Sequence, residues 1–158
     1  MRALARCGLK SSATMTYGMG ESLEERIAHL DVVRRIQDET GIIRAFIPWS
    51  FSPAHTGMEE VLPATGVDYL KIIAIARIYL NNVAHFQAGW LTEGLKLAQL
   101  ALSFGADDFG GVLMEEVVVR ATGIEMRTNS EEIIDLIRNA DKIPCQRDSD
   151  YRILRRYE

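Results

Sequence analysis

The architecture of this chain is indicated by Thr40-Gly41-Ile42-Ile43-Arg44-Ala45-Phe46-Ile47-Pro48-Trp49, read together with Ser12-Ala13-Thr14-Met15-Thr16-Tyr17-Gly18. Each stretch is a short run typical of a β-strand and ends in aromatic residues, Gly or Pro. A helix is expected between them, because Ser22 and Glu25 form a capping box and Gly41 stops the helix. The two stretches therefore predict a βαβ unit whose strand ends carry the kinds of residue that a ligand pocket needs.

The alternation of strand and helix continues along the chain. Strands are predicted at 13–17, 45–49, 85–90 and within 105–111, helices at 22–41, 69–80, 91–104, 112–121 and 131–139 (capped by Ser130), and a weak strand or loop at 124–128. The long segment 50–65 is predicted to be a functional loop. Four βα units in series predict a parallel sheet with right-handed crossovers.

The length of the chain limits how much of a barrel it can form. A complete (βα)₈ TIM-type barrel takes about 250 residues, and this chain has 158. Residues 1–158 are therefore interpreted as a single partial α/β domain, half of such a barrel with about four βα units. A self-sufficient open sheet is the alternative.

Composition and charge exclude several classes of protein. Apolar residues make up 47% and charged residues 25% of the chain, which is ordinary for a globular domain. The net charge of −4 argues against nucleic acid as a partner, and Arg152, Arg155 and Arg156 are interpreted as a solvated helix face. The most apolar segment, 69–80, is too short and too charged to span a membrane. A cytoplasmic location is expected, since the start carries no signal-peptide pattern.

Cysteines and carboxylates are the residues that could bind a metal. Cys7 and Cys145 cannot form a CxxC motif and are interpreted as ordinary reduced thiols. An acidic cluster raises the alternative of a carboxylate metal site in a hydrolase. It consists of Asp107, Asp108, Glu115 and Glu116. No His lies at ligand spacing beside it, and its adjacent glutamates point differently on a helix, so no metal site is predicted.

The predicted third strand carries polar side chains on one face. Alternation places His85 and Gln87 on one face and Trp90 on the other. Polar side chains would have no role against a helix layer, so His85 and Gln87 are predicted to point inside the barrel. There they would contact the substrate or form a hydrogen-bonded core. Trp49 and Trp90 each end a predicted strand and could form an aromatic wall for a planar ligand, with core packing as the alternative.

The first predicted strand ends in Tyr17-Gly18-Met19-Gly20-Glu21. Its two glycines would let the backbone approach a ligand closely, and Glu21 could accept hydrogen bonds from a hydroxyl or an amine. A loop with an acidic residue at the start of a helix explains these residues equally well. Both interpretations stay open on the residues alone.

Ordered matches to one family run along nearly the whole chain. They are Gly8-Leu9-Lys10-Ser11-Ser12-Ala13-Thr14-Met15, Leu23-Glu24-Glu25-Arg26 with His29-Leu30, Ile36-Gln37-Asp38-Glu39-Thr40-Gly41, Ala45-Phe46-Ile47-Pro48-Trp49, Ala64-Thr65-Gly66-Val67-Asp68-Tyr69-Leu70, Phe104-Gly105-Ala106, Gly110-Gly111 with Glu115-Glu116, and Gln146-Arg147-Asp148. On these segments the chain resembles the dehypoxanthine futalosine cyclases, a radical S-adenosylmethionine (SAM) family of menaquinone biosynthesis.

The resemblance is to the C-terminal half of these enzymes. Their N-terminal half carries a Cys-x3-Cys-x2-Cys loop that binds a [4Fe–4S] cluster, which cleaves SAM. That cluster-binding half is expected to be absent from this chain, which has two cysteines. The resemblance therefore implies that the isolated chain is inactive and needs an N-terminal half-barrel, or a homodimer partner, to cover its open sheet edges.

The resemblance also implies cofactors, substrate and residue roles. SAM and the [4Fe–4S] cluster are the expected cofactors of the complete enzyme, and Tyr17, Gly18 and Glu21 match a strand motif whose backbone lies against the SAM adenine. The substrate-binding candidates, chosen by position, are Trp49, His85, Gln87 and Trp90. The catalytic residues are unknown. In the implied reaction a 5′-deoxyadenosyl radical takes hydrogen from the ribose of dehypoxanthine futalosine, the sugar radical adds to the benzoate ring, and oxidation gives the cyclic product.

Several positions depart from the family pattern, and they lie near predicted strand ends. They are Thr16 in place of Met, Met19 in place of His, Ile42-Ile43 in place of Gly-Phe, and Asp107 and Val117 each in place of Asn. These differences leave open which futalosine compound is the substrate. The alternatives are a sibling enzyme similar to aminofutalosine synthase and a non-catalytic half-barrel that acts as a binding or scaffold protein.

Overall fold

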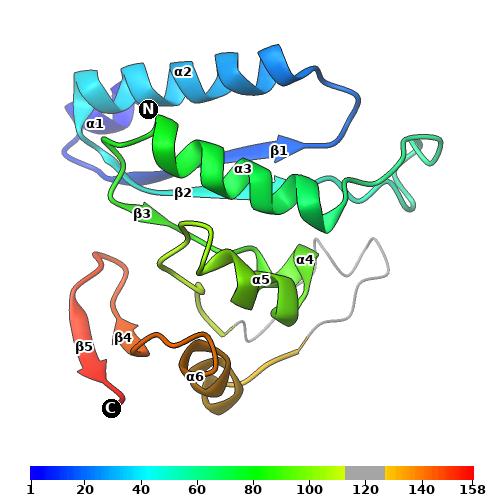
Figure 1. The fold of residues 1–158 in the computed structure, drawn as a ribbon. Helices are drawn as coiled ribbons and strands as arrows, with labels where there is room; N and C mark the ends of the chain where they lie inside the picture. The colour runs from blue at the N-terminus through cyan, green and yellow to red at the C-terminus, as the bar shows by residue number, and fades with distance from the viewer. Residues whose placement is uncertain (113–126) are drawn as a thin grey trace.

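A computed structural model describes residues 1–112 and 127–158 of the chain (Figure 1). Its helices are α1 (Arg2–Arg6), α2 (Leu23–Thr40), α3 (Gly66–Tyr79), α4 (Trp90–Glu93), α5 (Leu95–Ala101) and α6 (Ser130–Arg138). Its strands are β1 (Ser11–Tyr17), β2 (Ile43–Ser50), β3 (His85–Phe86), β4 (Cys145–Arg147) and β5 (Ile153–Arg156). Helix α1 has no counterpart among the predicted elements.

Three parallel strands form the central sheet in the order β1-β2-β3. β1 and β2 pair in parallel along the whole of β1, while a fourth strand is reduced to one parallel bridge between Gln87 and Asp108. The prediction of a parallel α/β sheet is confirmed, with the expected fourth strand present as this bridge.

Strand β3 is shorter than the predicted strand at 85–90. It ends at Phe86; Gln87 then forms the single bridge to Asp108, and the amide of Gly89 donates to the hydroxyl of Tyr69 (2.8 Å). Helix α4 then begins at Trp90. The prediction that Trp90 ends a strand is therefore wrong.

Helices α2 and α3 both begin with capping boxes. In α2 the Glu25 amide donates to Ser22 Oγ (3.2 Å) and the Ser22 amide donates to the Glu25 carboxylate (2.7 Å), as predicted. Gly41 ends α2 in the left-handed conformation that glycine adopts without strain (φ 62°). Helix α3 begins earlier than residue 69, because Thr65 and Asp68 form a second capping box.

The helix predicted at 91–104 is divided in two. Gly94 has φ 85° and ψ 155°, outside the helical region, and separates α4 from α5. Helix α5 ends at Ala101. The elements predicted at 112–121 and 124–128 fall, except for residues 112, 127 and 128, outside the described residues.

The cap of α6 is one residue earlier than predicted. The Oδ1 of Asn129 accepts from the Glu132 amide (2.9 Å), so Asn129 is the cap and Ser130 is the first helical residue. Asn is as good a cap as Ser, so the cap residue alone does not decide between the two positions.

The C-terminal residues form an antiparallel hairpin of β4 and β5, called the C-terminal hairpin below (residues 145–157). Asp148 closes its turn by accepting from the amide of Arg152 (2.9 Å). The interpretation of Arg152, Arg155 and Arg156 as a helix face is therefore wrong. β5 is nevertheless exposed throughout, so the arginines are solvated.

Helices α2 and α3 cover one face of the sheet (Figure 1). The core beneath them contains side chains with no exposed surface. Among the largest of these are Tyr17, Leu30, Phe46, Tyr69 and Phe86. On the other face, called the open face below, Thr14 and Thr16 are exposed, although parallel sheets are normally covered on both faces.

The two ends of the sheet are built differently. At the amino ends of the strands lies the C-terminal hairpin, held in part by Arg44 of β2, which donates to the carbonyl of Ser149 (2.6 Å). At the carboxyl ends lies the loop 51–65 (Figure 1). None of the described helices has both the length and the apolar character needed to cross a membrane.

Candidate functional site

The open face is built from alternate positions of the strands. Thr14 pairs with Ile47, and Thr16 pairs with Trp49, one step nearer the carboxyl ends. Trp49 is half-buried there. An indole beside two threonines gives this end of the face both an apolar surface and hydroxyl groups.

His85 and Gln87 belong to the same open face. Their neighbour Phe86 points the other way, since its ring lies under the guanidinium of Arg77 on α3 (4.8 Å). Side chains alternate along a strand, so the side chains on either side of Phe86 point away from the helices. This is the orientation that the sequence predicts for both residues.

His85 is nevertheless placed at the amino end of β3. Its imidazole stacks on the ring of Tyr151 in the C-terminal hairpin, with centroids 3.8 Å apart and an interplanar angle of 5°. Its Nδ1 lies 2.7 Å from the Asp107 carboxylate. These contacts give His85 a structural role in holding the hairpin, at the end of the sheet away from the loop 51–65.

Gln87 lies closer to the carboxyl end and rests on a glycine. A Cβ built on Gly110 would lie 2.8 Å from Gln87 Nε2, so a larger residue there would displace this amide. Gly110 has φ 76°, which also favours glycine. Gln87 and Trp49 are thus the two substrate candidates that the open face presents.

Trp90 is separated from that surface. Its side chain is 4% exposed and belongs to the hydrophobic core at the start of α4. Trp49 and Trp90 therefore do not form the predicted aromatic wall together, because Trp90 packs in the core.

Tyr17 points its side chain into the helix layer. Its ring lies beneath the guanidinium of Arg26 (5.3 Å), and its hydroxyl is buried with no hydrogen-bond partner in the described part of the chain. Burial, reinforced by the nearby carboxylate of Glu93, raises the pKa of Tyr17. The phenol of Tyr17 therefore does not face the open face, and its carbonyl accepts from the amide of Phe51 (2.8 Å).

Glu21 shapes the loop that follows β1. Its carboxylate accepts from the amides of Gly18 and Met19 (2.7 Å each) and from Arg26 Nε (2.7 Å). Partial burial would raise the pKa of Glu21, but these hydrogen bonds outweigh it and hold the pKa below its ordinary value. Gly18 packs against Ala64, since a Cβ there would be 3.1 Å from the Ala64 Cβ.

Glu93, a half-buried carboxylate at the carboxyl end of β2, was not predicted as a site residue. It accepts from the Ser50 amide and from Thr92 Oγ1, both at 3.3 Å. Burial raises the pKa of Glu93, and these long hydrogen bonds offset only part of that effect. The available signal was an acidic residue inside the apolar run that follows the third predicted strand.

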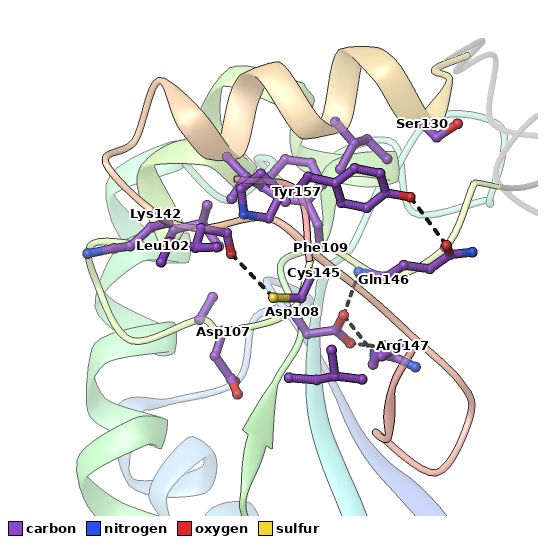
Figure 2. Close-up of a pocket in the computed structure, with 18 of the residues that line it drawn as sticks. Leu102, Asp107, Asp108, Phe109, Ser130, Lys142, Cys145, Gln146, Arg147 and Tyr157 are labelled. Carbon is purple, nitrogen blue, oxygen red and sulfur yellow. Dashed lines mark hydrogen bonds and ion pairs between the residues drawn. The ribbon is translucent and has the colours of Figure 1, made fainter. Parts of the chain in front are cut away.

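A cavity of about 870 Å³ lies between α6, residues 106–112 and the C-terminal hairpin (Figure 2). Asp108, which is 8% exposed, lies on its wall and is bound by both Arg147 and the hydroxyl of Tyr151 (2.9 Å). The guanidinium of Arg147 also lies over the Tyr151 ring (3.9 Å). Asp108, Arg147 and Tyr151 on this side of the cavity thus bind one another and hold the C-terminal hairpin in place.

The described residues can be tested against the implied cofactors. Among them there is no group of three or more His, Cys, Asp or Glu that could hold a metal ion, and Cys7 and Cys145 are both exposed. Asp107 and Asp108 are engaged by His85 and Arg147, while the other two members of the acidic cluster lie outside the described residues. An iron–sulfur cluster does not fit these residues. The backbone at Gly20 lies in open space, since an added Cβ would meet no described atom within 4 Å.

The family to which the chain belongs is shown by comparison with known proteins. By its fold, the chain is an α/β protein with a parallel sheet that has one open face. Residues 39–157 match the family model described as the CofH/MqnC C-terminal region. The chain therefore belongs to the CofH/MqnC family, in its C-terminal region.

Relatives with different names match nearly the whole chain. Cyclic dehypoxanthine futalosine synthase of Halalkalibacterium halodurans is 46% identical over 158 residues, covering 100% of this chain and 43% of the relative. A 5-amino-6-(D-ribitylamino)uracil–L-tyrosine 4-hydroxyphenyl transferase of Methanococcoides burtonii is 42% identical, covering 95% and 45%. Aminodeoxyfutalosine synthase of Thermus thermophilus is 39% identical, covering 98% and 43%. The chain spans less than half the length of these curated relatives.

Proposed function

We propose that this chain is the C-terminal part of a radical SAM enzyme that cyclises dehypoxanthine futalosine in menaquinone biosynthesis. The observation that carries the proposal is the 46% identity to a cyclic dehypoxanthine futalosine synthase along the entire chain. The family match over residues 39–157 supports the same assignment.

The proposed partner of the chain is an N-terminal half-barrel. The parallel sheet has helices on one face and an exposed Thr14 and Thr16 on the other. A parallel sheet of this kind is stable when its second face is also covered, and a barrel closes the free edges as well. We therefore propose that the three strands and the Gln87–Asp108 bridge form the second half of a (βα)₈ barrel.

The open face gives the residues their proposed roles. Trp49 and Gln87 contact the substrate, one through its indole surface and the other through its amide. The main chain of the loop around Gly18 contacts SAM, and Glu21, which binds the amides of Gly18 and Met19, fixes the shape of this loop. SAM, when bound in the complete enzyme, supplies the radical chemistry. His85 and Trp90 are left out of this surface because of the stacking of His85 and the burial of Trp90.

The main alternative is an enzyme similar to aminodeoxyfutalosine synthase. The relative with that name is 39% identical over 160 aligned residues, so the two activities share this region. A non-catalytic half-barrel is the alternative from a different class, and it would cover its open face by forming a dimer.

A fusion protein tests the proposal. The N-terminal part of the Halalkalibacterium relative is joined ahead of Met1, the cluster is reconstituted, and dehypoxanthine futalosine is supplied with SAM and a reductant. The proposal predicts a cyclic product by mass spectrometry. A folded fusion that contains the cluster and cleaves SAM, but leaves every futalosine compound unchanged, would overturn it.

A further inference from the structure

The C-terminal hairpin and the turn that follows the fourth strand share one buried carboxylate. The Tyr151 hydroxyl donates to Asp108 Oδ2 (2.9 Å), and Arg147 donates to both oxygens of Asp108. Asp108 Oδ1 also accepts from the amide of Gly110 (3.1 Å). Charge-assisted hydrogen bonds at a site this buried hold their partners in a defined geometry, so the hairpin and the Gly110 turn are coupled.

The same turn supports a side chain of the open face. The amide of Gln87 lies against the main chain of Gly110, since a Cβ at Gly110 would be 2.8 Å from Nε2 and 3.1 Å from Cδ of Gln87. The Gln87 and Asp108 backbones are also bridged. A displacement of Gly110 must therefore change where the amide of Gln87 can lie.

We propose that the C-terminal hairpin positions the Gln87 side chain through Asp108 and Gly110, and so tunes recognition of a polar group on the ligand. A carboxamide offers one acceptor and two donors, which suits a hydroxyl or carboxylate of a small molecule. Tyr151 and Arg147 act as positioning residues through Asp108. The proposal rests on the proposed function only for the identity of that ligand.

The first test follows the Gln87 amide directly in the full chain. Its side-chain NH₂ resonances are assigned in ¹⁵N-labelled protein by their loss in Gln87→Ala. Tyr151→Phe keeps the ring stacked on His85 and removes one hydrogen bond to Asp108, so it is expected to shift the Gln87 resonances. The exposed strand residue Arg156 provides the control, and Arg156→Ala is expected to leave them in place.

A second variant allows the same test if Tyr151→Phe does not fold. Arg147→Lys keeps the charge but gives up the fork that binds both oxygens of Asp108, and it is expected to shift the same resonances. If either variant is folded and the Gln87 resonances do not move, the positioning role is wrong. This readout does not depend on turnover.

A double-mutant cycle in the active fusion protein tests the consequence for recognition. Tyr151→Phe is expected to raise the KM for the futalosine substrate about threefold or more, the effect of losing one hydrogen bond, with kcat changed less. In a Gln87→Ala background the same substitution should add nothing to KM, since the two residues act through one path. Equal increases in both backgrounds would contradict the inference. An inactive wild-type fusion would count against the proposed function and leave the resonance test to judge the hairpin.

Discussion

His85 and Tyr151 stack face to face, with ring centroids 3.8 Å apart and planes 5° from parallel. This contact joins the first residue of β3 to the turn of the C-terminal hairpin. Asp107, next to the buried Asp108, bonds the same imidazole at 2.7 Å. The hairpin has only two strands, which are marginal by themselves, so its order depends on contacts of this kind.

Removal of the stacked ring should destabilise the chain. His85→Ala loses an aromatic contact and a hydrogen bond, and is expected to lower the free energy of unfolding by about 1–2 kcal/mol. Urea unfolding followed by circular dichroism measures this. The control is Lys71→Ala at an exposed position of α3, which should cost much less. Equal effects of the two substitutions would show that the stacked pair contributes nothing.

The cap of α6 can be identified by a pair of substitutions. Asn129→Ala removes the acceptor for the Glu132 amide and is expected to cost about 1 kcal/mol. Ser130→Ala, one residue further on, is expected to be close to neutral, since Ala is a good helix residue. A larger loss of unfolding free energy for Ser130→Ala than for Asn129→Ala would restore the cap predicted from the sequence.

The stability of the folded chain should depend on pH through Glu93, which lies at the carboxyl end of β2. Its pKa is raised by burial, so the folded chain binds its proton more tightly than the unfolded chain does. The folded state is then favoured at low pH, and that advantage is lost as pH rises from the ordinary value of 4.5 through the raised pKa. Glu93→Gln should therefore gain Tm relative to wild type as pH increases across this window.

The control for this titration is Glu60→Gln, in the exposed part of the loop 51–65. Its Tm difference from wild type should stay nearly constant over the same pH range. A Glu93→Gln curve that runs parallel to wild type at all pH values would mean that Glu93 is not stabilised in its protonated form.

The contribution of Glu21 to stability should have the opposite pH dependence. The amides of Gly18 and Met19 hold its pKa below the ordinary value of 4.5 despite partial burial, so its contribution is present above that value and is lost as pH falls through the lowered pKa. Glu21→Gln leaves one oxygen for three donors and is expected to cost about 1–3 kcal/mol at neutral pH.

The readout for Glu21 is the unfolding free energy at neutral pH and at about pH 3, below the ordinary carboxylate pKa. The difference between wild type and Glu21→Gln should shrink in acid. A difference that is unchanged in acid would show that the ionised carboxylate is not what holds the loop after β1. Exposed Glu24, at the start of α2, offers a comparison through Glu24→Gln.

Most of the sheet and its first helices could be predicted from local signals in the sequence. The capping box of Ser22 with Glu25 and the stop at Gly41 are read from neighbouring residues, and the structure has both. The capping box of Thr65 with Asp68 is equally local, although the helix was predicted to begin later. Alternation along the third strand correctly placed His85 and Gln87 away from the helices, because a side-chain period of two survives even where the strand itself is short.

The parts that failed depend on contacts between distant residues. The chain leaves the sheet soon after β3, where the Gly89 amide donates to the hydroxyl of Tyr69 on α3, a contact that no local pattern reveals. Arg155 and Arg156 lie in a strand because β5 pairs with β4. Asp108 is a possible metal ligand by sequence, and only the fold shows that Arg147 already neutralises it.

Substrate competition in the fusion of this chain with the N-terminal part of its Halalkalibacterium relative decides whether the chain belongs to a cyclase. Dehypoxanthine futalosine is supplied together with the substrates of aminodeoxyfutalosine synthase, and the products and 5′-deoxyadenosine are measured by mass spectrometry. The account predicts SAM-dependent formation of cyclic dehypoxanthine futalosine as the main product, reduced in Trp49→Ala and Gln87→Ala. Aminodeoxyfutalosine as the main product, or SAM cleavage with neither product, would contradict it.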